Sequence, residues 1–212
     1  MARRDVCVSI RSAEDASVNA RMRAMTRGNH YSYDEYLVLE KYSDVKHEYV
    51  AGEIYAMAGG TPGHARLGAA VIALLRPQLR GCSVYTSDLR IRIVETDLST
   101  YPDVSVICGP PQLAANDAEA VVNPIVVVEV TSRSTECYDR GVKLAHYQLL
   151  PSVQEILLVS HREPRVTLYR RDGSGWTEND YRAGQTVEVL SVAARIAIDE
   201  LYRDGINDRE LG

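Results

Sequence analysis

The sequence predicts an α/β fold in which helices flank a mixed central sheet. Residues 125–131 form a nearly continuous apolar run, which is typical of a strand buried on both faces. Segments with helical spacing alternate with short extended segments along the chain. Because no repeat or linker interrupts this pattern, residues 29–212 are predicted to form a single domain. Residues 1–28 are polar and aperiodic, and they are predicted to be a flexible N-terminal extension.

The composition is that of an ordinary globular protein. The 212 residues are 45% hydrophobic and 25% charged, which is enough for a sizeable core. No segment has the length of a membrane span or the pattern of a signal peptide, which predicts a cytoplasmic protein with no membrane partner. The net charge of −5 argues against non-specific coating of nucleic acid, but it leaves room for a local basic site.

The four cysteines give no sign of a zinc site. Cys7, Cys82, Cys108 and Cys137 form no C-x-x-C pair and have no histidine at zinc-finger spacing. They are therefore expected to be scattered, reduced, small hydrophobic residues.

The first elements have clear boundary signals. Ser32 and Glu35 form a capping box, which predicts a helix over residues 32–43. Short extended segments on either side of Ala51-Gly52 predict a hairpin. Residues 59–62 then break the chain and open a second helix, which ends by Gly81. Its predicted buried stripe consists of Leu67, Val71, Leu74 and Leu75.

The middle of the chain is predicted to form mainly strands. Residues 83–96 and 101–108 are predicted to be extended, residues 109–123 to form a polar loop, and residues 125–131 to be the central strand. Strict alternation places Arg90 and Arg92 on one face, where they either lie on a solvated surface or contact a nucleic-acid backbone.

A third helix and several strands complete the predicted domain. Residues 134–152 form the helix, with Tyr138, Val142, Ala145 and Leu149 as its buried stripe. Strands follow over residues 154–160, 165–171 and 175–182. Residues 188–204 supply a last strand and a short helical segment.

Glu129 is the unusual residue of the central strand. A carboxylate inside a dry sheet is costly unless it is paired or binds a metal. Asp103, after Pro102, stands at the mouth of another predicted strand, and two carboxylates from adjacent strands suit Mg²⁺. The alternative is that Glu129 lies near the strand end and faces water or an arginine.

Lys143 is the candidate cation for this site. A helix that returns over the sheet would bring it level with Glu129, where an ammonium could orient water or stabilise negative charge. The alternative is a solvated Lys143 paired with Asp139, four positions earlier.

Three ordered blocks carry a family resemblance. They are "HEYVAGEIYAMAGGTPGHARL", "YPDVSVICG" and "PIVVVEVTSRSTECYDRGVKLAHYQLLPSVQEILLVS". The sequence resembles the Uma-two family of restriction-endonuclease-like proteins, in the PD-(D/E)XK nuclease superfamily, from about residue 31 to residue 171. The resemblance implies a restriction-endonuclease-like fold.

The same resemblance implies site residues. Asp103 matches the Asp of the PD element and Glu129 matches the acidic residue of (D/E)XK. The superfamily lysine belongs two positions later, where Thr131 stands, so Lys143 is the candidate replacement. Glu53 resembles a supplementary acidic metal ligand, although a role in the hairpin turn competes with this interpretation.

The resulting functional hypothesis is an endonuclease that depends on Mg²⁺ or Mn²⁺ and hydrolyses phosphodiester bonds, in DNA. Arg133, Arg140 and His64 are predicted to contact nucleic acid, while His64 could equally be an exposed first-turn residue. The superfamily implies a homodimer. The alternative hypothesis is a non-catalytic module that keeps the fold and binds nucleic acid or protein.

Overall fold

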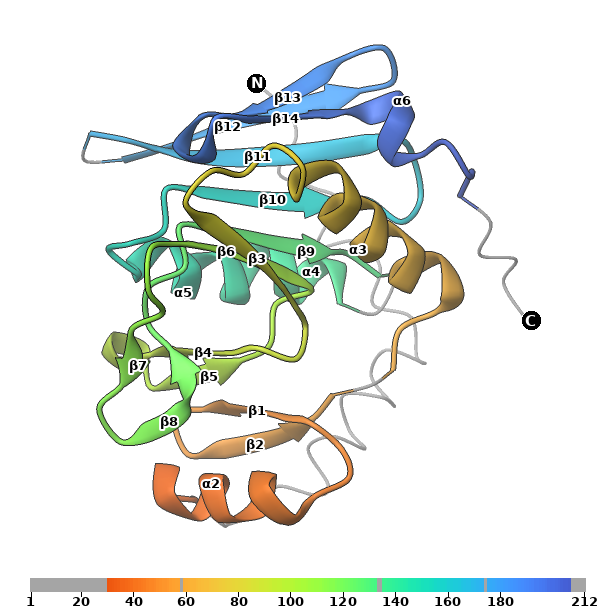
Figure 1. Cartoon of the computed structure of the whole chain (residues 1–212). Helices are drawn as coiled ribbons and strands as arrows, with labels where there is room; N and C mark the ends of the chain where they lie inside the picture. Colours follow the sequence, from red (N-terminus) through yellow and green to blue (C-terminus); the bar gives the residue numbers. More distant parts are fainter. Residues whose placement is uncertain (1–29, 58, 133–134, 174, 207–212) are drawn as a thin grey trace. The chain divides into compact units, whose positions relative to one another are not determined.

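The computed structural model describes residues 30–57, 59–132, 135–173 and 175–206. The predicted N-terminal extension, residues 1–28, lies entirely outside these ranges, and Arg133 lies outside them as well. By its internal contacts the chain divides into two compact units, Met1–Met57 and Ala58–Gly212. Figure 1 traces both units along the chain.

The first unit holds the predicted helix and hairpin. Helix α2, Tyr33–Tyr42, begins with the Ser32 capping box. Strands β1, His47–Val50, and β2, Glu53–Ala56, pair antiparallel as a hairpin. The helix packs on the hairpin through a buried cluster of three tyrosines, Tyr33, Tyr36 and Tyr49.

The hairpin turn needs its small residues. Ala51 and Gly52 both have positive φ, 47° and 93°, as the two central residues of a tight hairpin turn require. A Cβ on Gly52 would also lie 2.3 Å from the ring of His30. Both predicted elements of this unit are therefore confirmed.

The second unit is built on a mixed six-stranded sheet in the order β12-β11-β10-β9-β6-β3. Strand β9, Val126–Val130, pairs parallel with β10 and antiparallel with β6. The mixed central sheet is therefore confirmed. The other bounds are β3 Cys82–Thr86, β6 Val104–Cys108, β10 Glu155–Val159, β11 Arg165–Asp172 and β12 Gly175–Arg182.

Residues 109–123 contain strands, so the predicted polar loop is wrong. Strands β7, Leu113–Ala114, and β8, Asp117–Val121, pair with each other, and β8 also pairs with β4, Arg90–Ile93. Strand β4 pairs in turn with β5, Leu98–Thr100. The short 3₁₀ turn η1, Val94–Thr96, connects them.

Arg90 and Arg92 are buried, so both sequence-based interpretations of them are wrong. Arg90 donates to the two carboxylate oxygens of Asp117, each at 2.9 Å, and to the hydroxyl of Tyr101. Arg92 pairs with Asp97. Asp117 of this region thus forms a buried ion pair with Arg90, although most of residues 109–119 are exposed.

Helix α3, Pro62–Leu75, covers one face of the sheet. Leu67, Val71 and Leu75 pack into one core with the alternate valines of β9 and of its neighbours, which confirms most of the predicted stripe. The end of the chain joins this core as a hairpin rather than as one strand. It consists of β13 Thr186–Val189, η3 Leu190–Val192, β14 Ala194–Ala197 and helix α6 Ile198–Leu201.

The predicted third helix covers the opposite face, but in three parts. Helix α4, Glu136–Tyr138, passes through a π-helical turn, η2, Asp139–Lys143, into α5, Leu144–Leu149. In Figure 1, α4 and α5 run along one side of β9 and β6, and α3 lies on the other.

The predicted buried stripe of this helix is wrong. Val142 and Leu149 are 52% and 54% exposed, whereas Asp139, Lys143 and Tyr147 are buried. The face that meets the sheet is thus polar, and an apolar-stripe rule selects the wrong side of such a helix.

Cys82 and Cys108 lie directly opposite each other on β3 and β6 and form a disulfide. The expectation of reduced, separate cysteines is wrong for this pair. Cys137 is exposed. None of the helices in the described part of the chain is long and apolar enough to cross a bilayer.

Candidate active site

Strand alternation explains why Glu129 stands among valines. Side chains of a strand point alternately to its two faces, and Val126, Val128 and Val130 belong to the core beneath α3. Glu129 points to the other face, where the α4–η2–α5 segment covers it, and it is only 4% exposed. The interpretation of Glu129 as a water-facing residue at a strand end is therefore wrong.

Two donors from one helical segment contact Glu129. The Lys143 Nζ atom lies 2.9 Å from Glu129 Oε1, and the Tyr147 hydroxyl donates to the same oxygen at 2.6 Å. Among the described residues, the structure records no hydrogen bond or ion pair on Oε2. Lys143 is 5% exposed, so it is not a solvated helix residue.

Burial dominates the protonation of Glu129. Desolvation raises the pKa of its carboxyl to about 8, and the negative charges of Asp103 and Asp139 act in the same direction. Lys143 and the hydrogen bond from Tyr147 lower the pKa without offsetting burial. The raised pKa favours the protonated form of Glu129 in the metal-free protein, and a bound cation would favour release of that proton.

Asp103 lies beside Glu129 on the neighbouring strand. The register that pairs Val104 with Val128 continues to place Asp103 across from Glu129. The backbone N–H of Val130 donates to Asp103 Oδ2 at 2.7 Å, which fixes the carboxylate against β9. The side chain of Asp103 remains 19% exposed.

His64 pairs with Asp103 through the same oxygen. It lies in the first turn of α3, where the Thr61 side chain caps its backbone N–H, and its Nε2 is 3.3 Å from Asp103 Oδ2. The hydrogen bond to Asp103 is the main cause that raises the pKa of His64. A Cβ on Gly60 would lie 2.7 Å from the His64 ring, so the glycine permits this close approach.

The donor set fits a hard divalent cation in part. Asp103 and Glu129 offer carboxylate oxygens from adjacent strands, and Mg²⁺ needs only one or two such ligands because it keeps several waters. Within the described ranges, however, no three His, Cys, Asp or Glu side chains are grouped as a metal site. Glu53 belongs to the first unit, on β2, where its carboxylate is exposed and accepts from the Tyr55 hydroxyl.

Arg140 makes internal contacts. Its Nε donates to Glu136 at 3.2 Å, and both terminal nitrogens lie 3.4 Å from the hydroxyl of Thr167. Of the three residues predicted to contact nucleic acid, Arg140 and His64 thus both have protein partners, and Arg133 lies outside the described residues.

Tyr147 and Asp139 are site residues whose roles the sequence did not reveal. Tyr147 follows Lys143 by four residues, and Asp139 precedes it by four. Neighbours at this spacing share one helical face, so the lysine could have indicated both. Their burial beside Glu129 depends on which face meets the sheet, and the sequence pattern indicated the other face.

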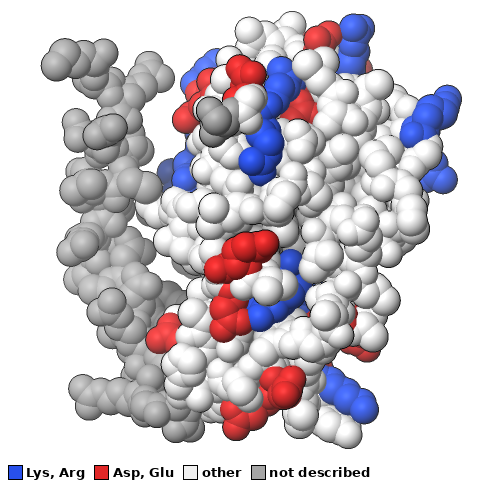
Figure 2. All heavy atoms as spheres, turned by 90° about the vertical axis from the view of Figure 1, so that its left-hand side faces the viewer, with Lys and Arg blue, Asp and Glu red and all other residues white. Residues whose placement is uncertain are grey.

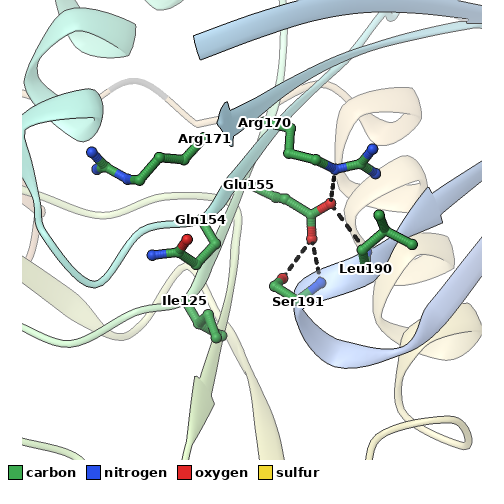
Figure 3. Close-up of a pocket in the computed structure, with 7 residues that line it drawn as sticks. All are labelled: Ile125, Gln154, Glu155, Arg170, Arg171, Leu190 and Ser191. Carbon is green, nitrogen blue, oxygen red and sulfur yellow. Dashed lines mark hydrogen bonds and ion pairs between the residues drawn. The ribbon is translucent and has the colours of Figure 1, made fainter. Parts of the chain in front are cut away.

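A second buried carboxylate, Glu155 on β10, provides a useful contrast. It lines a hollow of about 410 Å³ together with Arg170, Leu190 and Ser191 (Figure 3). Its Oε1 accepts from Arg170 Nε at 2.8 Å and from the Leu190 N–H, and its Oε2 accepts from the Ser191 N–H and hydroxyl. Both oxygens accept hydrogen bonds, which indicates that Glu155 has a structural role and holds η3 against the sheet.

Comparison with known proteins identifies the family. The chain matches the Uma2 family, described as "Putative restriction endonuclease", over residues 33–199. The chain therefore belongs to the Uma2 family, as the sequence resemblance predicted.

Two relatives and one solved structure are similar to this chain over much of its length. An uncharacterized Synechocystis protein, slr1290, is 39% identical over 175 residues, 81% of this chain and 91% of the relative. A second Synechocystis protein, sll1609, is 36% identical over 66% of this chain and 80% of its own length. A crystal structure titled as a putative nuclease from Anabaena variabilis superposes with a TM-score of 0.64 at 21% identity. It covers 80% of this chain and 96% of that one, and at this identity it shows a shared fold alone.

Proposed function

We propose that this protein is a metal-dependent endonuclease that hydrolyses phosphodiester bonds in DNA. The observation that supports it most is the pair of carboxylates, Asp103 just before β6 and Glu129 on the adjacent β9, with the buried ammonium of Lys143 beside Glu129. Membership of a restriction endonuclease family supports the same reaction class.

In this proposal, Asp103 and Glu129 would hold Mg²⁺ or Mn²⁺, and the supplementary role of Glu53 stays a prediction. A bound ion of this kind lowers the pKa of water and stabilises charge on a phosphoryl oxygen. Lys143 stabilises the negative charge that develops when water adds to phosphorus and the 3′ oxygen leaves. His64 holds Asp103 in place through Oδ2.

The position of Thr131 makes Lys143 necessary to this mechanism. The superfamily places its lysine two residues after the acidic residue, but here Thr131 is buried and its backbone N–H donates to Val159 on β10. Lys143 reaches the same carboxylate from the covering helix instead. The lysine thus comes from a different element, while its ammonium still lies beside Glu129.

Further expectations belong to the same proposal. Arg133, Arg140 and His64 would contact the phosphates of DNA, which for Arg140 requires release from its internal partners. A homodimer would supply two active sites for the two strands of a duplex. A cytoplasmic location would give the enzyme access to DNA.

A non-catalytic binding module is the second candidate function. The net charge of −5 favours this function, as does the distribution of charged residues on the surface. On the face drawn in Figure 2, described basic and acidic residues are interspersed in small groups rather than gathered in a broad basic stripe. Such a module would bind protein or nucleic acid without metal-dependent turnover.

Cleavage assays separate the two candidates. Plasmid, linear and single-stranded DNA and RNA would be incubated with Mg²⁺, Mn²⁺ or EDTA. Wild type would be compared with Asp103→Asn, Glu129→Gln and the control Glu119→Gln, whose side chain is 84% exposed. We expect metal-dependent cleavage of DNA that falls at least about a hundredfold in the first two variants and persists in the control.

Two results would contradict the proposal. Asp103→Asn and Glu129→Gln variants that are folded and cleave as fast as wild type would remove these residues from the mechanism. A folded wild type that cleaves none of the substrates would favour the binding module.

A further inference from the structure

The orientation of the Glu129 carboxylate is a separate question from its charge. The last torsion of a glutamate side chain is broad and has only weak intrinsic preferences. A carboxylate that must present one oxygen to a ligand therefore needs directional partners. In this protein Lys143 and Tyr147 both contact Oε1, at 2.9 Å and 2.6 Å.

The two partners differ in how well they define direction. An ammonium is a compact charge on a flexible side chain with three rotatable donors. Lys143 therefore affects the charge of the Glu129 carboxylate more than its orientation. The hydroxyl of Tyr147 sits on a rigid ring that is 1% exposed and packed in the core. Its short hydrogen bond therefore fixes where Oε1 lies, and with it the plane of the carboxylate.

Asp103 is held in the same way. Its Oδ2 atom receives both the Val130 N–H, at 2.7 Å, and His64 Nε2, at 3.3 Å. Among the described residues, the contacts of each carboxylate of the pair thus fall on one oxygen. Glu155 does not follow this pattern, since its donors are divided between both oxygens.

We propose that Tyr147 is a positioning residue, which anchors Oε1 of Glu129 so that Oε2 is presented to the divalent cation. This inference rests on the proposed function and deepens it. Tyr147 touches neither substrate nor metal in this account and acts only through Glu129.

The test replaces Tyr147 with phenylalanine, which keeps the ring and removes only the hydroxyl. The matched control is Tyr202→Phe, since Tyr202 is also buried and its hydroxyl donates to the backbone carbonyls of Ser160 and Arg165. Mn²⁺ affinity would be measured by calorimetry, kcat and KM by DNA cleavage, and folding by circular dichroism and thermal unfolding.

We expect Tyr147→Phe to weaken Mn²⁺ binding by about tenfold or more, as is usual when a partner of a metal ligand is removed. Its kcat should fall while KM for DNA stays the same. Tyr202→Phe should keep both the Mn²⁺ affinity and kcat of wild type, even where its melting temperature falls.

The outcomes distinguish this inference from the function on which it rests. If wild type binds Mn²⁺ and cleaves DNA, and Tyr147→Phe matches it in both, the positioning role is overturned and the nuclease proposal stands. If Tyr147→Phe loses only thermal stability, Tyr147 is a packing residue. If wild type neither binds Mn²⁺ nor cleaves, both proposals fail together.

Discussion

Two buried glutamates show how the protein assigns different tasks to the same side chain. Glu155 shares its two oxygens among four donors, so its charge is balanced and its place in the fold is fixed. The two contacts that the described residues make with the Glu129 carboxylate both fall on Oε1, and burial raises its pKa. At the scale of the residue, Glu129 is the carboxylate that a cation would stabilise.

The raised pKa of Glu129 predicts how stability depends on pH. Between its ordinary value of 4.5 and the value of about 8 in the folded state, the folded protein keeps a proton that the unfolded chain has lost. The free energy of unfolding should therefore fall as pH rises through this window, by on the order of a few kcal/mol.

Urea unfolding in EDTA at pH 5 and pH 8 measures this effect. Glu129→Gln cannot titrate, so the decrease should be smaller in that variant than in wild type. The contribution of His64, whose pKa is also raised, has the same sign and is present in both proteins. An equal decrease in the two proteins would show that Glu129 does not carry the proton.

Part of the site could be predicted residue by residue. Asp103, Glu129 and Lys143 were identified because a carboxylate in an apolar strand is costly and needs partners. The oxygen that each partner contacts could not be predicted, because it depends on how the helix is rotated over the sheet. The contact of Tyr147 with Oε1 could not be predicted for the same reason.

At the scale of the element, the π-helical turn η2 determines this rotation. The N–H of Leu144 bonds to the carbonyl of Asp139, five residues earlier, so the segment holds one residue more than an α-helix would. Asp139, Lys143 and Tyr147, which lie in or just after this turn, are all buried. Such turns are frequent at functional sites.

Removing Gly141 should undo this arrangement. A helix one residue shorter turns Asp139 relative to Lys143 and Tyr147, since each residue turns the helix by about 100°. We expect Mn²⁺ affinity to fall at least about tenfold. Gly141→Ala keeps the length, and its Cβ would meet nothing within 4 Å, so it should bind Mn²⁺ as wild type does.

Calorimetry on these two variants, with circular dichroism as a check of folding, tests the role of the turn. Unchanged Mn²⁺ affinity after the deletion would mean that the register of η2 is irrelevant to the site. Weakened affinity in Gly141→Ala as well would point to the residue itself rather than to the length of the turn.

The elements that were predicted correctly are those with local signals. The capping box at Ser32 and the turn at Ala51-Gly52 need no tertiary context. The polar loop over residues 109–123 and the solvated Arg90 were wrong because Arg90 and Asp117 neutralise each other inside the fold. The Cys82–Cys108 bond was missed because it depends on the strand pairing of β3 with β6.

At the scale of the whole molecule, the fold and the family agree. The mixed sheet with helices on both faces is shared with the Anabaena structure, and the Uma2 match spans residues 33–199. These comparisons establish the family and the architecture. The proposed chemistry rests on Asp103 and Glu129 of the second unit.

The most direct test of the central claim is a calorimetric titration of Mn²⁺ into wild type, Asp103→Asn and Glu129→Gln. We predict saturable binding of Mn²⁺ to wild type and a loss of at least about tenfold in Mn²⁺ affinity when either carboxylate is replaced. Binding of equal strength in all three proteins, or no binding to a folded wild type, would contradict it.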